Sequence, residues 1–151
     1  MLSINPKEVI TPNNLIEAFH NYHNHLALSV SPLANLPGVR ARLEEPGKKT
    51  VSPSPLGAAL AAELKSLIAS LEPKDALLPQ THPRRYAYEV LHQTVVLGRS
   101  ATDTAARLYI SRSQLYRIRE KAISDLCQLW QERELLRNEQ DGKVSSSESL
   151  V

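Results

Sequence analysis

The cationic side chains of this chain are concentrated in one part of its second half. Residues 84–121 carry eight lysines and arginines against three carboxylates, a net charge of +5, whereas residues 1–83 are balanced and residues 122–151 carry a net charge of −3. Arginine presents a rigid fork of N–H donors and lysine a compact charge, so both bind phosphate oxygens. Such a segment is typical of a surface that binds polyanions. Charge alone is equally compatible with a solvated basic face.

Within this segment, residues 101–126 have the spacing of two helices joined by a short turn. Ser100 and Asp103 have the spacing of a capping box, which predicts the start of a two-turn helix. Residues 109–111 form the turn, and a long helix is predicted over residues 112–138. Small or apolar residues occupy the positions that must face inward where the two helices cross. These inward positions are Ala105, Leu108, Ile110, Leu115 and Ile118.

The outward positions of the same segment carry side chains that suit contacts to DNA. Arg112 and Arg117 can make paired hydrogen bonds to guanine or phosphate, and Gln114 can pair with adenine. Serine hydroxyls and the free amides of a helix start suit a phosphate oxygen. An ordinary helical hairpin with a charged outer face is the alternative. The predicted DNA-binding residues are Arg99, Ser111, Arg112, Ser113, Gln114, Tyr116, Arg117 and Lys121.

The stretch ISRSQLYRIREKAISDL (residues 110–126) resembles the last helix-turn-helix of bacterial sigma factors, their fourth region, and the regulators that share this module. DTAARLY (103–109) is similar to the first helix of that module, and RRYAYEVLHQTVVLGRSATD (84–103) to the helix before it. The resemblance covers residues 84–130. It implies a bacterial transcription regulator that binds double-stranded DNA in a sequence-specific manner. The matching positions are Ile110, Ser111, Arg112, Leu115, Ile118, Lys121, Ala122, Ile123 and Leu126.

The chain departs from the sigma-factor pattern at three positions. Tyr109 stands where the family usually has glycine, at a position that often needs a positive φ. Ser113 and Tyr116 replace the promoter-reading acidic and basic residues of the family. Nothing in the chain resembles the sigma-factor regions that melt DNA and bind RNA polymerase. The resemblance therefore implies DNA binding and not a working sigma factor.

Two other classes of function are weighed against DNA binding. A protein–protein adaptor would use the same helix-turn-helix to contact RNA polymerase or another regulator without reading DNA. An enzyme would need catalytic residues, but the chain has no glycine-rich phosphate loop, nucleophile elbow or HExxH motif. His20 and His23 could share a metal ion, yet no cysteine or carboxylate stands at zinc-site spacing. We therefore expect no enzyme activity, no catalytic residue, no cofactor and no metal.

Composition predicts an all-α fold, a small helical bundle with a C-terminal helix-turn-helix and a long recognition helix. Aromatic residues make up 5% of the chain and glycines number five, so the core must be built mainly from leucine, isoleucine, valine and alanine. This composition, with few alternating stretches, favours helices over strands. The expected organisation is an N-terminal helical segment (1–37), a flexible linker (38–53), an accessory helix (54–72), the helix-turn-helix domain (84–138) and a disordered tail (139–151).

Local signals place the helices of the first half. A stripe of apolar residues predicts one helix over residues 12–28. Two Ser-Pro pairs, at 31–32 and 54–55, predict a short turn and the start of a longer helix, because serine caps a helix and proline fits its first position. The stripe of the first helix is Leu15, Phe19, Tyr22 and Leu26.

The apolar residues of the C-terminal helix allow two interpretations. Their near-heptad spacing fits a homodimer seam, which Arg133 interrupts. They would equally well pack on the N-terminal helices of the same chain. The residues concerned are Leu115, Ile118, Ala122, Leu129 and Leu136.

The sequence also predicts the compartment. No basic segment followed by an apolar run marks a signal peptide, and no uncharged stretch reaches transmembrane length. Cys127 is the single cysteine, so no intrachain disulfide forms, as is usual in a reducing environment. We therefore expect a cytoplasmic protein that does not contact a membrane.

Overall fold

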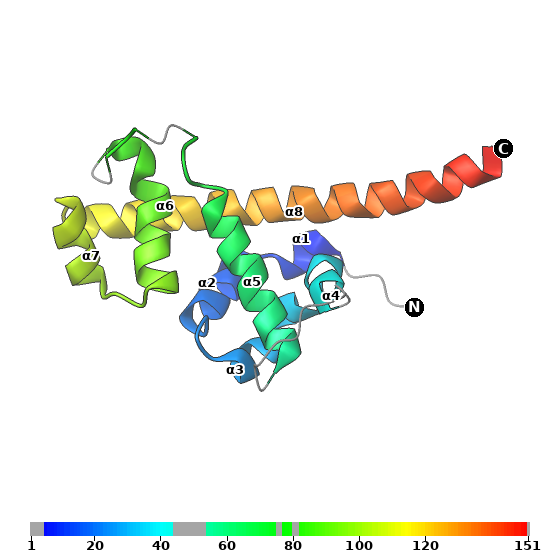
Figure 1. Cartoon of the computed structure of the whole chain (residues 1–151), viewed down its shortest axis with the longest axis horizontal. Coiled ribbons are helices and arrows are strands. Elements are labelled where there is room, and N and C mark those ends of the chain that lie inside the picture. The colour runs from blue at the N-terminus through cyan, green and yellow to red at the C-terminus, as the bar shows by residue number, and fades with distance from the viewer. Residues whose placement is uncertain (1–4, 44–53, 75–76, 80–81, 151) are drawn as a thin grey trace.

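The computed structural model describes residues 5–43, 54–74, 77–79 and 82–150. Within these ranges every regular element is helical and no strand occurs, so the predicted all-α fold is confirmed (Figure 1). The elements are α1 (Pro6–Val9), α2 (Pro12–His20), α3 (His25–Ser29), the 3-10 turn η1 (Pro32–Asn35), α4 (Pro37–Leu43), α5 (Pro55–Ala69), the 3-10 turn η2 (Pro83–Arg85), α6 (Tyr86–Leu91), the π-helical turn η3 (His92–Val96), α7 (Ala101–Leu108) and α8 (Arg112–Leu150).

Side-chain caps begin most of the short helices in the first half. Asn5, Thr11, Asn24, Ser31 and Ser54 each accept a hydrogen bond from a backbone N–H two or three residues further on. Such a bond satisfies one of the amides that a helix start leaves without a partner. In all of these except the helix after Asn24, proline takes the first position, where its missing N–H costs nothing. The Ser-Pro starts predicted from sequence are therefore confirmed.

The single helix predicted over residues 12–28 is wrong. Helix α2 ends at His20, a turn follows, and Asn24 caps the separate helix α3. Asparagine side chains offer the backbone alternative hydrogen bonds, which compete with an uninterrupted helix. The break changes the buried set, because Leu26 is 61% exposed and Leu28 is fully buried in its place.

The first part of the predicted linker is also wrong. Residues 38–43 belong to helix α4, in which Gly38 and Val39 are buried. The Gly38 N–H donates to Glu134 Oε1 of α8 at 3.2 Å. This contact joins residues 96 positions apart, and local composition gives no sign of it. The rest of the predicted linker, residues 44–53, lies outside the described residues.

The main core forms where the N-terminal helices wrap the middle of α8. Leu64 of α5, Leu33 of η1 and Trp130 of α8 are all fully buried in it. Leu91 and Val95, from α6 and η3, belong to the same core. The N-terminal helices therefore pack directly on the C-terminal half of the chain.

Helices α3 and α5 cross with their backbones in close contact. A Cβ added at Gly57 would overlap the carbonyl oxygen of His25. Only glycine lets the two backbones approach in this way. Gly57 therefore sets the distance between α3 and the accessory helix.

Helix α8 settles the two interpretations of its apolar stripe. Leu115 and Ala122 are buried within the chain, Leu129 packs against the main core, and Ile118 is half-buried. Packing within the same chain therefore accounts for these four residues, and a homodimer through the C-terminal helix stays a prediction. Leu136 is the exception, being 58% exposed.

The end of α8 also differs from expectation. The helix continues to Leu150 and projects away from the bundle, whereas composition predicts a disordered tail over residues 139–151 (Figure 1). No proline interrupts the segment, and each residue that extends an existing helix adds one hydrogen bond.

Candidate nucleic-acid interface

The turn between α7 and α8 has the geometry of a helix-turn-helix. Helix α7 ends at Leu108, and Tyr109 adopts a left-handed conformation with φ 57° and ψ 42°. The Ile110 N–H then donates to the carbonyl oxygen of Ala105 at 3.0 Å. A residue with a side chain thus adopts the positive φ that the sequence resemblance leads us to expect at this position. The Tyr109 side chain is 86% exposed, so the ring is not held by packing.

A small core of its own lies beneath this turn. Val90 of α6, Ala105 and Leu108 of α7, and Leu115 of α8 are each at most 3% exposed. The small side chain at Ala105 lets α7 and α8 cross closely. Of the five inward positions predicted from sequence, Ala105, Leu108 and Leu115 are buried as expected. The other two, Ile110 and Ile118, are partly buried against them.

Serine hydroxyls begin both helices of the motif. The Ser100 hydroxyl accepts from the Asp103 N–H, and the Ser111 hydroxyl accepts from the Gln114 N–H, each at 3.0 Å. The predicted capping box is only half formed, because the Asp103 carboxylate pairs with Arg107 Nε at 3.2 Å. Asp103 therefore neutralises one cation of the basic segment.

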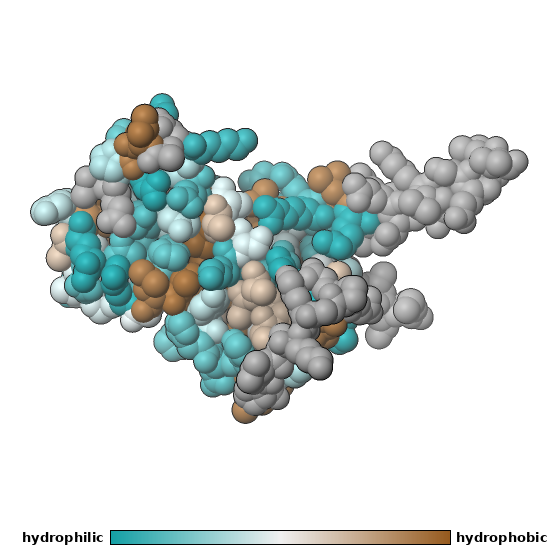
Figure 2. All heavy atoms as spheres, viewed as in Figure 1, coloured by the Kyte–Doolittle hydropathy of each residue, from teal (hydrophilic) through white to brown (hydrophobic). Residues whose placement is uncertain are grey.

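The start of α8 presents a group of exposed polar and cationic side chains, which we call the recognition face. Its members Ser113, Gln114, Arg117 and Lys121 are all exposed, and at 3.6 residues per turn they lie within about 100° around the helix. Arg112 is exposed at the first position of α8. Among the described residues no ion pair engages either arginine or the lysine. In Figure 2 hydrophilic residues cover most of the end formed by α7 and the start of α8.

Arg99 lies apart from the recognition face. It is half-buried at the start of α7, where its Nη1 donates to Gln93 Oε1 at 3.2 Å and its backbone N–H to the Gln93 carbonyl at 2.9 Å. Gln93 in turn donates to Glu89 Oε2 at 2.8 Å, and Arg85 pairs with Glu89 Oε1 at 3.2 Å. Glu89 and Gln93 are both buried. This polar chain holds Arg99 in place.

The helix before the motif is less regular than predicted. The resemblance predicts a helix within residues 84–103, but the backbone passes from the 3-10 turn η2 through α6 to the π-helical turn η3. Gly98, with φ 70°, ends it. A π-turn inserts one extra residue into a helix, and this shifts the facing of the residues that follow it.

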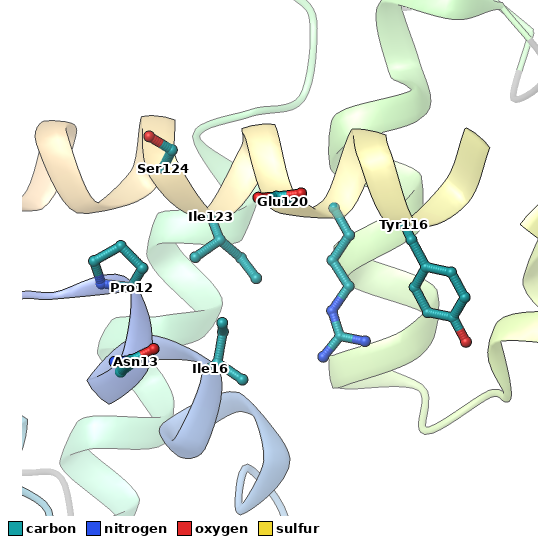
Figure 3. Close-up of a pocket in the computed structure, with 8 residues that line it drawn as sticks. Pro12, Asn13, Ile16, Tyr116, Glu120, Ile123 and Ser124 are labelled. Atoms are coloured by element: carbon teal, nitrogen blue, oxygen red, sulfur yellow. The ribbon is translucent and has the colours of Figure 1, made fainter. Parts of the chain in front are cut away.

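Tyr116 lies beside the recognition face, in a groove between α2 and α8. It is 47% exposed, and the groove has a volume of about 590 Å³. In Figure 3, Ile16 of α2 and Ile123 of α8 point toward one another across this groove, and the Tyr116 ring lies beyond them. Sequence reasoning missed these α2 neighbours, since α2 and α8 are about a hundred residues apart in the chain.

Comparisons with protein-family models, curated proteins and solved structures find no match to this chain. The interpretation of the site therefore depends on its own geometry.

Three further observations on the described residues concern other kinds of chemistry. Burial raises the pKa of the Cys127 thiol to about 11, so it stays protonated at neutral pH and is a poor nucleophile. No three His, Cys, Asp or Glu side chains in the described ranges gather closely enough to hold a metal ion. No helix in those ranges is both long and apolar enough to cross a membrane.

Proposed function

We propose that this chain is a sequence-specific regulator of transcription that binds double-stranded DNA through α7 and α8. One observation carries the proposal: the exposed start of α8 holds Gln114, Arg117 and Lys121 on one face, without ion-pair partners in the described chain, above a packed helix-turn-helix core. The major groove of B-DNA admits one α-helix of this kind. In this proposal the chain acts in the bacterial cytoplasm.

The side chains of the recognition face and the polar residues around it divide into two roles. Arg117 and Gln114, one turn apart, read base edges, because their paired donors and acceptors match guanine and adenine. Ser111, Ser113 and Lys121, with Arg112 at the helix start, contact phosphates and fix the register of the helix on the duplex. Arg99 meets the backbone at the start of α7, since the first helix of the motif crosses the DNA backbone. Tyr116 contacts the edge of the DNA major groove from the side of α8 that faces α2.

A binding titration tests this division. Duplexes selected from a random pool give a preferred sequence, and each variant is titrated with that duplex and with a scrambled one. Arg117→Ala and Gln114→Ala should each weaken binding to the preferred duplex by roughly 1–3 kcal/mol and relax the preference at one base pair. Arg133→Ala, which removes an exposed cation from the same helix away from the recognition face, is the matched control and should change neither affinity.

An adaptor that contacts RNA polymerase or another regulator is the second candidate. Two exposed tyrosines favour it, since Tyr109 is 86% exposed and Tyr116 is 47% exposed, and tyrosine is enriched at protein interfaces. The same titration separates the two functions. If the folded Arg117 and Gln114 variants bind every duplex as the wild type does, α8 does not read DNA, and the adaptor takes precedence.

A further inference from the structure

A second cluster of basic side chains lies away from the recognition face, in a cavity near the end of α2 and the start of α7. The cavity has a volume of about 280 Å³, and four basic side chains line it. We call it the basic pocket and define it by His20, His23, Arg99 and Arg119. No carboxylate is among the described side chains that line it.

Two of these side chains are fixed before any ligand binds. Arg99 is held by Gln93 through the contacts described above. His23 Nε2 donates to the carbonyl oxygen of Val95 at 3.1 Å, and its ring meets that of Tyr22 edge-on with centroids 4.9 Å apart. Groups that are already ordered lose little conformational entropy when a ligand binds.

Arg119 is the unexplained cation of the pocket. It is half-buried on the inner flank of α8, and within the described part of the chain no hydrogen bond or ion pair engages it. A guanidinium is always charged, and its removal from water is unfavourable unless an anion offsets the loss. Arg119 is therefore a cation that lines the pocket and remains free to pair with a bound anion.

The backbone at the pocket also favours an anion. Gly98 takes a φ of 70°, and a Cβ at this position would lie 3.8 Å from His23 Nε2. The turn at Gly98 leads directly into α7, whose first residue Ala101 lines the pocket. The amides at a helix start carry partial positive charge and add to the field of the two arginines.

We infer that the basic pocket binds one phosphate group, supplied either by a DNA strand beside the recognition helix or by a free phosphorylated small molecule. If the phosphate comes from DNA, the inference rests on the proposed function. If it comes from a free small molecule, the inference does not. His20 ends α2 and His23 lies in the turn after it, whereas Arg99 lies just before α7 and Arg119 belongs to α8. The bound phosphate therefore bridges the N-terminal bundle and the helix-turn-helix.

The first arm of the test uses inorganic phosphate and the full chain. Calorimetric titration at constant ionic strength should show saturable binding to the wild type, and phosphate should raise the melting temperature. Arg119→Gln should weaken phosphate binding by about tenfold or more, because it removes a charge-assisted hydrogen bond. His20→Gln should also weaken phosphate binding, and because His20 is exposed the change carries little risk to folding. Arg133→Gln is the control and should bind as the wild type does.

The second arm measures the salt dependence of binding to a random duplex. If a DNA phosphate occupies the pocket, Arg119→Gln should lower the slope of log K against log salt by about one unit, and Arg133→Gln should leave it unchanged. Phosphate binding without any duplex binding would support the pocket and sink the proposed function. Normal duplex binding by every pocket variant, together with no phosphate binding, would overturn the pocket and leave the proposed function standing.

Discussion

Replacing Tyr109 by glycine should stabilise the protein. A left-handed conformation costs a residue with a side chain roughly 1–2 kcal/mol, and glycine escapes this cost. Glycine also gains freedom in the unfolded chain, which offsets about 0.4–1 kcal/mol of the benefit. The Tyr109 ring is 86% exposed, so its removal sacrifices little buried surface. The net expectation is an increase of about 0.5–1 kcal/mol in the free energy of unfolding.

Tyr109→Ala is the matched control, because it removes the ring and keeps the backbone strain. It should unfold close to the wild type, and the glycine variant should exceed it. For a chain of this size, 1 kcal/mol moves the melting temperature by about 2–4 °C, which thermal unfolding followed by circular dichroism resolves. A glycine variant that is less stable than the alanine variant would show that the turn is not left-handed at this residue, and the helix-turn-helix geometry would then be wrong.

Three further predictions follow from contacts described above. Gly57→Ala should lower the free energy of unfolding by about 1–3 kcal/mol in urea titrations. The overlap of the new methyl group with the His25 carbonyl outweighs the gain of about 1 kcal/mol in helix propensity. An unchanged midpoint of urea unfolding would contradict the close crossing of α3 and α5. Burial raises the pKa of Glu134, so the wild type should lose stability as pH rises from about 4.5 through that raised pKa. Glu134→Gln can still accept the hydrogen bond from Gly38 and should lose less stability over this pH range. Parallel stability profiles of the two proteins from pH 4.5 to 7 would exclude this explanation. Lys121→Gln should weaken binding to all duplexes about equally and lower the salt slope by about one unit, and a sequence-dependent effect would instead make it a base-reading residue.

The features predicted correctly from sequence are those fixed by neighbouring residues. Ser54, Ser100 and Ser111 each cap an amide three residues on, so a short window of sequence contains the whole interaction. The inward and outward positions of the helix-turn-helix follow from helical periodicity in the same way. Cap and periodicity together suffice to place the recognition face.

The features that sequence reasoning missed depend on contacts between distant residues. Helix α4 is held by the bond from Gly38 to Glu134, and Gln131 donates to the Ile10 carbonyl across 121 positions at 2.7 Å. Arg119 is not among the predicted DNA-binding residues, and its helical spacing places it on an inner flank of α8. Only the fold brings it close to Arg99, His20 and His23. No local sequence pattern predicts that these residues lie close together.

One continuous helix belongs to both cores, and this makes α8 a lever. Leu115 in the small core and Trp130 in the main core are 15 residues apart, which is about 22 Å at 1.5 Å per residue. A tilt of about 5° at the main core would move the start of α8 sideways by about 2 Å on that arm. A displacement of this size is enough to break the hydrogen bonds of a side chain to a base edge. A change in packing around Trp130 would thus reach the far end of the helix with no alteration at the turn.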